Sequence, residues 1–216
     1  MYGMSMLVTH PKITIELIPF KKEFLPTLVA GFSSMRVHMH TNQTFAQVLE
    51  NEQEWYDRTR KDGDIVSWAI RIPGAEMPIG VTALHDIKAI DGSCKSGIII
   101  WDQAWWGKGV ASAAHLGRTL FAADTLNRCL IRTSVRSDNA ASRKALERVG
   151  YYVWGTEPMS GFRQGKYIST DHLLWLHPDR RDLFYARGVY PPQVIDTALY
   201  RAKTALDQAR TVVAFP

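Results

Sequence analysis

The sequence predicts a mixed α/β protein, of the α+β kind, whose central sheet is mostly antiparallel. Three strand-like runs separated by short turns occupy residues 65–72, 78–84 and 97–101, which is typical of an antiparallel meander. The pattern then changes to helix, strand, helix and two strands between residues 107 and 175. A doubly wound parallel sheet would alternate strands and helices throughout, so the sequence predicts a mixed sheet instead.

The N-terminal part supplies one strand and two helices. Residues 13–18 alternate between apolar and polar side chains as in a strand, which Pro19 ends. Apolar residues recur at helical spacing from Phe24 to Phe32. Thr44 is suited to cap a second helix that includes Val48, Leu49 and the Trp55-Tyr56 pair.

The second half of the chain predicts a helix from Gly107 to about Asp124, a strand at 129–135 and a helix at 139–149 that Gly150 closes. Strands follow at 151–154 and 168–175. Beyond them, residues 192–210 predict a helix with one apolar face: Val194, Ile195, Ala198, Leu199, Ala202, Ala205, Leu206 and Ala209. We therefore expect a domain at 1–176 and a helical extension at 177–216 that packs on the domain or on a second subunit.

Composition limits the class of protein. The chain has 216 residues, of which 46% are hydrophobic and 22% charged, as in a globular protein with a full core. A net charge of +5 suits an anionic ligand such as a nucleotide cofactor, and the absence of a dense Lys/Arg run disfavours nucleic acid. Cys94 and Cys129 form no C-x-x-C motif, so no metal site is expected. No signal peptide or membrane-length apolar run is visible, which predicts a cytoplasmic protein.

The stretch from Gly97 to Ala111 runs from a strand through a glycine loop into a helix. Backbone N–H groups in such a loop converge on one concavity, and the helix N-terminus adds partial positive charge, so a pyrophosphate fits there. Gly107 and Gly109 would let the backbone approach the ligand. The loop is neither a Walker A motif nor G-x-G-x-x-G, and by itself it could be a plain strand–helix turn.

Residues 106–111, W-G-K-G-V-A, resemble the acetyl-CoA loop of GNAT-superfamily acetyltransferases, whose pattern is (Q/R)-x-x-G-x-(G/A). Gly109 and Ala111 match its small positions, whereas Trp106 replaces Gln or Arg. The W-W-G-K-G form is similar to that of the RimJ/RimL-like subfamily, which acetylates protein N-termini and small amines. Residues 139–151 also resemble the family block N-x-x-S-x-x-x-x-E-x-x-G-F/Y, and the likeness extends over residues 13–176.

The resemblance implies the GNAT acyl-CoA N-acyltransferase fold, with a sheet splayed, usually at a bulge, between strands 98–101 and 130–135. Free backbone N–H groups near Ile99 and Ile100 would pair with the pantetheine arm and polarise the acetyl carbonyl. Acetyl-CoA is then the co-substrate, and no metal is required. The implied cofactor-binding residues are Ile99, Ile100, Trp101, Trp106, Gly107, Lys108, Gly109, Val110, Ala111, Ser112, Asn139 and Ser142.

The catalytic groups follow the family less closely. Cys94-Lys95-Ser96 stands where relatives often carry a glutamate base, and Leu146 stands where other branches carry a tyrosine acid. Ser142 is the candidate donor to the leaving thiolate. His85 and Asp86 are candidate bases near the expected acceptor cleft, although a strand-end histidine is often only locally bonded. His38 and His40 fall in a segment that commonly lines the acceptor site, or in a solvated loop.

The expected activity is transfer of an acetyl group from acetyl-CoA to a primary amine, by direct attack in a ternary complex. Three alternatives remain open at this point. The chain could be a degenerate GNAT domain that binds an acyl-CoA or a protein, a transferase using another acyl donor, or a nucleic-acid protein. The partners expected are acetyl-CoA and the amine acceptor, with a homodimer through the C-terminal helix as one arrangement.

Overall fold

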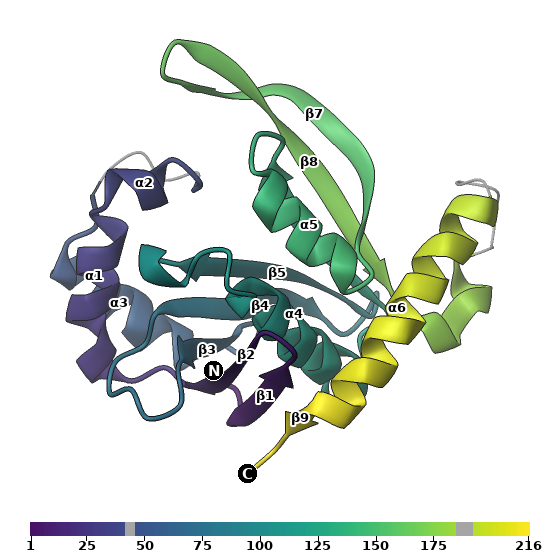
Figure 1. Ribbon diagram of the computed structural model, residues 1–216, viewed down its shortest axis with the longest axis horizontal. Helices are drawn as coiled ribbons and strands as arrows, with labels where there is room; N and C mark the ends of the chain where they lie inside the picture. The colour runs from purple at the N-terminus through teal and green to yellow at the C-terminus, as the bar shows by residue number, and fades with distance from the viewer. Residues whose placement is uncertain (42–45, 185–191) are drawn as a thin grey trace.

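The computed structural model describes residues 1–41, 46–184 and 192–216, and folds them around one nine-stranded sheet (Figure 1). The strand order is β7-β8-β6-β5-β4-β3-β2-β1-β9, and every neighbouring pair is antiparallel except β5–β6. The mixed, mostly antiparallel sheet predicted from the sequence is confirmed. The strands are β1 (Met6–His10), β2 (Ile13–Pro19), β3 (Val66–Arg71), β4 (Gly80–Lys88), β5 (Ser93–Ile100), β6 (Leu130–Arg136), β7 (Tyr152–Arg163), β8 (Lys166–Leu176) and β9 (Val213–Ala214).

Among the described residues, the helices and the sheet enclose two large apolar cores and a third, small cluster of Leu176, Ile195 and Leu199. The helices are α1 (Leu25–Phe32), α2 (Met35–His38), α3 (Leu49–Thr59), α4 (Val110–Leu120), α5 (Ala140–Arg148) and α6 (Pro192–Val212). α1 and α3 pack with Ala69 and Trp101 in one core, whereas α4, α5 and α6 contribute to a larger core with Trp68 and Trp175. Thr44, the predicted cap of the second helix, lies outside the described residues; α3 begins at Leu49 after Val48.

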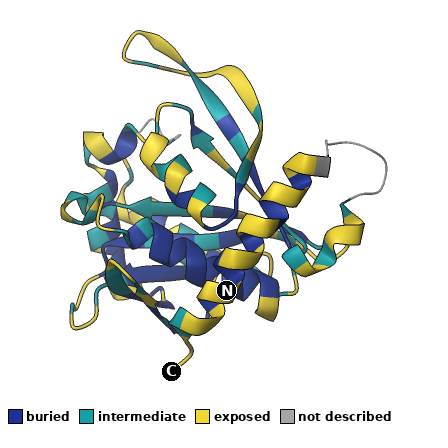
Figure 2. Cartoon of the chain, turned by 45° about the vertical axis from the view of Figure 1, so that its right-hand side comes forward, coloured by how far each residue is buried: buried dark blue, intermediate teal, exposed yellow. Residues whose placement is uncertain are grey.

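Helix α4 is almost completely enclosed. Every residue from Ser112 to Leu120 is buried, because the sheet lies beneath the helix and both α5 and α6 contact it. In Figure 2 this centre is dark blue, whereas the projecting β7–β8 hairpin is mostly exposed. Polar side chains on α4 therefore cannot be satisfied by bulk water and need partners inside the protein.

The alanine face of α6 lies on its own domain. Ala198, Ala202, Ala205 and Ala209 are all at most 5% exposed, and a Cβ atom added at Gly150 would lie 2.5 Å from the Cα of Ala202. The end of α5 and the middle of α6 thus approach at backbone distance, which only small residues permit. After α6, β9 pairs with β1 at the edge of the sheet.

The sheet divides between β5 and β6. Their parallel pairing covers only Ser93–Lys95 with Leu130–Arg132, after which the strands separate. The separation implied by the family resemblance is therefore present. The one register shift between β4 and β5 lies at His85–Lys88, and the register from Gly80 to His85 with Lys95 to Ile100 is regular. β5 and β6 thus separate although β5 has no bulge along the stretch that borders the gap.

Candidate active site

The gap between β5 and β6 has a closed end, and beyond Lys95 the β5 peptide groups that face the gap have no strand partner on β6. Thr133 Oγ1 donates to the Ser96 carbonyl oxygen at 2.9 Å and closes one end, while Trp106 Nε1 donates to the Ile100 carbonyl at 2.9 Å. The Gly97 carbonyl instead accepts from Thr82 on β4 at 3.0 Å. Since successive residues of a strand direct their peptide groups to opposite sides, the peptide groups of Ile98 and Ile100 face the gap and those of Ile99 face β4.

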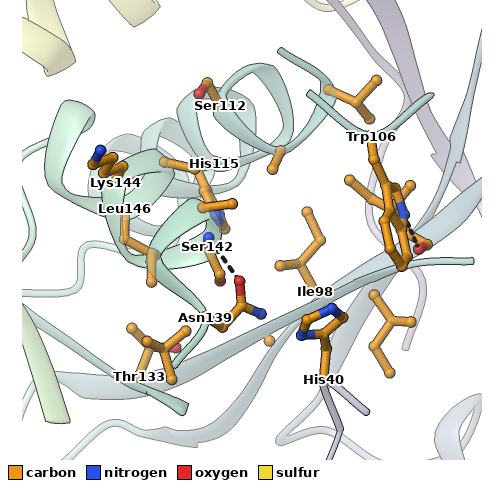
Figure 3. A pocket seen from close by; sticks show the side chains of 18 of the residues that line it. His40, Ile98, Trp106, Ser112, His115, Thr133, Asn139, Ser142, Lys144 and Leu146 are labelled. Carbon is orange, nitrogen blue, oxygen red and sulfur yellow. Dashed lines mark hydrogen bonds between the residues drawn. The ribbon is translucent and has the colours of Figure 1, made fainter. Parts of the chain in front are cut away.

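A cavity of about 680 Å³ occupies this gap. It is lined by β5 and β6, by the glycine loop, by the facing sides of α4 and α5, and by residues at the end of α2 (Figure 3). Of the residues implied by the resemblance, Ile99, Ile100, Trp106, Gly107, Gly109, Val110, Ala111, Ser112, Asn139 and Ser142 line it. Segments that are far apart in the chain therefore meet around one space large enough for a small-molecule ligand.

The glycine loop adopts the conformation that an anion site requires. Gly107 and Gly109 have φ angles of 75° and 92°, and a Cβ atom at Gly109 would lie 3.0 Å from Lys12 Cβ. Gly109 is the N-cap of α4, so the amide groups of Val110, Ala111 and Ser112 in the first turn have no intrahelical acceptor. Together with the helix dipole they form a seat for negatively charged oxygen atoms.

Cations from two other segments surround this seat. Lys12, in the turn between β1 and β2, and Lys144 and Arg148 of α5 line the same cavity. Burial, with the charges of Lys12 and Arg148, lowers the pKa of the neighbouring His10 side chain. The loop end of the cavity thus combines free amide donors with positive side chains, as binding of a phosphorylated ligand requires.

Helix α5 begins at the cavity wall. Asn139 is its N-cap, and the Asn139 Oδ1 atom accepts from the Ser142 backbone N–H at 3.1 Å (Figure 3). This bond orients the first turn of the helix and places Asn139, Ser142 and Leu146 along one side of the cavity. The capping role expected from the sequence and a position at the cavity therefore coexist at Asn139.

Two of the implied cofactor residues lie outside the cavity lining. Trp101 is 6% exposed and packs beneath α1, where a Cβ atom at Gly31 would lie 2.4 Å from its ring. Lys108 places its Nζ 4.9 Å from the centroid of the Trp105 ring. Trp106, in contrast, faces the cavity and meets the ring of His40 edge-on at a centroid distance of 5.6 Å.

The candidate bases His85 and Asp86 also lie away from the cavity. Asp86 forms an ion pair with Lys95 Nζ at 2.8 Å, and this bond holds the pKa of the carboxyl group below its usual value. Burial lowers the pKa of His85, which is opposite Lys95 in the β4–β5 pairing. Lys95 therefore holds the Asp86 carboxylate in an ion pair at the end where β5 is paired with β6. The Thr133–Ser96 hydrogen bond lies between this end and the cavity. Of the two histidines near α2, His40 lines the cavity and His38 does not.

Sequence reasoning missed several lining residues. Lys12 of the β1–β2 turn, Thr133 of β6, and Lys144 and Arg148 of α5 come from three separate segments, and only folding brings them together. His115 and Arg118 also line the cavity, and both are completely enclosed polar residues on α4. The sequence could have pointed to them, because His115 and Arg118 are polar residues three positions apart on the inward face of a mostly apolar helix.

The comparisons with known proteins identify the class. Residues 14–152 match the family model described as the acetyltransferase (GNAT) domain, so the chain belongs to the GNAT acetyltransferase family. Enzymes of this class transfer an acetyl group from acetyl-CoA to an amine. Within the described residues no helix is long and apolar enough to span a membrane, and no cluster of three metal-ligating side chains occurs.

Two solved structures illustrate the likeness of fold. Mycobacterium smegmatis RimJ in complex with CoA-disulfide is 14% identical, with a TM-score of 0.71 over 99% of this chain and 97% of that one. Spermidine N-acetyltransferase from Vibrio cholerae, in complex with CoA and spermine, is 20% identical, with a TM-score of 0.68 over 75% of this chain and 95% of that one. A search of curated protein sequences gives no match.

Proposed function

We propose that this protein is an acetyl-CoA-dependent N-acetyltransferase that acetylates a primary amine in a ternary complex. The observation that carries the proposal is one continuous cavity with an anion seat at the start of α4 and with the backbone N–H groups of Ile98 and Ile100 directed into the β5–β6 gap. The seat suits the phosphates of CoA, and the peptide groups suit the amide-containing pantetheine arm.

The chain's own groups suit direct transfer. The nitrogen of the neutral amine attacks the acetyl carbon, the C–S bond breaks, and the proton that the amine loses balances the one that the CoA thiolate finally gains. A backbone N–H in the gap polarises the acetyl carbonyl, and the Ser142 hydroxyl donates to the sulfur. Burial raises the pKa of the Cys94 thiol to about 12, which makes that cysteine a poor nucleophile and argues against an acyl-enzyme on it.

The charge of the cavity bears on the acceptor. Lys12, Arg118, Arg136, Lys144 and Arg148 line it, and no carboxylate does within the described part of the chain. Asp138 stands beside the cavity but is paired with Arg136 at 2.8 Å. A polyamine carries several positive charges and would meet repulsion here, whereas an acceptor with a single amine would not.

An α-amine fits best among single amines, which supports a RimJ/RimL-like acceptor: a protein N-terminus or a small molecule with a comparable amine. With a pKa near ~8 in free peptides, an α-amine reaches its neutral form far more readily than a lysine-type amine near ~10.4. This suits a cavity whose described lining offers no carboxylate base. His40 and Thr41 mark the acceptor end, where Arg163 Nη2 of the β7–β8 hairpin donates to the Thr41 carbonyl at 3.1 Å.

We further propose that residues 1–176 form the catalytic domain and that 177–216 complete it as an extension. A homodimer would then use a surface other than the alanine face of α6, since that face is buried within the chain.

The test is acetyl-CoA turnover across a panel of amines: peptides with free N-termini, the same peptides N-acetylated, spermidine, and simple alkyl amines. Intact-mass detection locates the acetyl group. We expect turnover with free N-terminal peptides and none with blocked ones. CoA binding without turnover on any amine would favour a degenerate binding module. Turnover only with a longer acyl-CoA would favour another donor.

A further inference from the structure

Helix α4 carries a buried cation without a compensating anion. Arg118 is 0% exposed and forms no ion pair with a carboxylate among the described residues. Its partners are all neutral: Nη1 donates to Thr82 Oγ1 at 2.9 Å and to the Gly97 carbonyl at 2.8 Å, and Nη2 donates to His115 Nδ1 at 2.9 Å. An unpaired charge in a dry interior is costly, so this arginine raises the question of what negative charge it faces.

The contact between Arg118 and His115 determines which ring nitrogen of His115 carries the proton. A guanidinium group can only donate, so His115 Nδ1 accepts and the proton resides on Nε2. Burial, and then the charge of Arg118, lowers the pKa of His115 well below its usual value, so the ring is neutral. His115 Nε2 is buried and has no hydrogen-bond partner within the described residues. His115 therefore offers one fixed N–H donor that lacks an acceptor.

The position of this donor relates it to the reaction. His115 and Arg118 line the cavity, and the Arg118 bond to Gly97 lies beside Ser96, whose bond to Thr133 closes the gap. Gly109, at the anion seat, precedes His115 by six residues. At a rise of about 1.5 Å per residue, the seat therefore lies about 9 Å from His115 along α4. A CoA molecule bound by its phosphates at the seat would extend its thioester end toward the closed end. Figure 3 shows His115 of α4 and Ser142 of α5 on the same side of the cavity.

We propose that His115, held as a donor by Arg118, donates a hydrogen bond from Nε2 to the CoA sulfur as the thioester breaks. This inference rests on the proposed acetyltransferase function. The electron pair of the C–S bond moves onto sulfur, the buried arginine favours the negative charge, and the imidazole keeps its proton throughout. His115 then contacts the reacting atoms, and Arg118 is a positioning residue that acts through it.

The direct measurement is the ionisation of the thiol of bound CoA. It is monitored as a function of pH through the ultraviolet absorbance of the thiolate. The variants are His115→Leu, which removes the donor, His115→Gln, which keeps an N–H near the Nε2 position, and Arg118→Met, which removes the cation at similar volume. Ser142→Ala tests the second candidate donor. His172→Leu, on β8 and outside the cavity lining, is the matched histidine control.

We expect His115→Leu to reduce the acid dissociation constant of the bound thiol about tenfold and kcat by about 10- to 100-fold, with a much smaller change in KM for acetyl-CoA. Arg118→Met should change both quantities in the same direction, and His115→Gln should recover part of the loss. The His172→Leu control should match the parent.

Unchanged thiol ionisation and unchanged kcat in His115→Leu would overturn the proposal, as would an effect confined to the KM for acetyl-CoA. CoA affinity of the parent, measured by calorimetry, separates this result from a failure of the proposed function, because a parent that binds no CoA refutes the function itself. Thermal melting identifies any variant that fails to fold. In that case His115→Gln and Arg118→Met decide the question, and parental thiol ionisation in Arg118→Met would also overturn the proposal.

Discussion

The two ends of the cavity are built differently. The donor end consists of the glycine loop, the first turns of α4 and α5, and the adjoining stretch of β5, all continuous with the buried centre of the fold. The acceptor end consists of Val37 of α2, which packs in the core with α1, and of His40 and Thr41, which side chains from other segments contact. Arg163 reaches Thr41 from the hairpin, and Arg36 donates to Gln103 at 3.2 Å. Local backbone geometry thus shapes the donor end, whereas side chains from separate segments shape the acceptor end.

The largest expected effect comes from a negative charge at the donor end. Ala111→Glu places a carboxylate in the first turn of α4, where it favours the helix but repels the phosphates of CoA. We expect CoA affinity to fall by at least about 100-fold, or roughly 2.7 kcal/mol, without loss of thermal stability. Calorimetric titration measures the affinity, and Ala111→Ser is the matched control of similar size. Parental affinity in Ala111→Glu would place the phosphate seat elsewhere.

A second effect at the donor end concerns stability as a function of pH. Because the pKa of His115 is depressed in the folded protein, below about pH 6.5 the unfolded chain binds a proton that the folded chain does not. The free energy of unfolding should therefore fall as pH drops, by up to about 1.4 kcal/mol per pH unit from this residue. Denaturant unfolding between about pH 7.5 and 5 should show a shallower dependence for His115→Gln.

His10, His85 and His177 also have pKa values lowered chiefly by burial, and they remain in the variant, so the quantity to compare is the difference between the two slopes. Equal slopes for parent and variant would mean that His115 takes up a proton in the folded protein, which would remove the neutral donor from the mechanism.

The smallest expected effect is at the acceptor end. His40→Ala removes the edge-on contact with Trp106 and one lining side chain, and leaves the seat at α4 intact. We expect the KM for the amine to rise about three- to fivefold, with the KM for acetyl-CoA unchanged, as for loss of one aromatic contact of about 0.5–1 kcal/mol. Initial-rate kinetics with each substrate varied separately tests this. A change in the KM for acetyl-CoA alone would assign His40 to the donor end.

The donor loop could be predicted from the sequence because its geometry is local. A strand, two glycines and a helix start are contiguous, and the positive φ angles of Gly107 and Gly109 follow from residue type. Trp101 shows the limit of this reasoning, because it follows the same strand yet turns into the α1 core against Gly31, seventy residues earlier. The alternation that directs Ile98 rather than Ile99 to the gap likewise depends on the register with β4.

Other features required tertiary information. β1 has only five residues, and β9 has two, so neither carries a periodic signal long enough to predict a strand. The positive charge at the loop end arises from Lys12 and Arg148, which are distant in sequence. His115 could have been noticed as a polar residue on the apolar stripe of its helix, but the tautomer set by Arg118 needs coordinates.

The pairing of Val213–Ala214 with Leu7–Val8 has a consequence for biosynthesis. A ribosome synthesises β1 before α6, which packs in the same core, and before β9, which pairs with the outer edge of β1. Until α6 and β9 have been synthesised, the outer edge of β1 is open, and apolar residues that face α6, such as Leu116 and Val149, are available to other nascent chains. Efficient production should therefore depend on chaperone protection of the growing chain, and products released before α6 should aggregate.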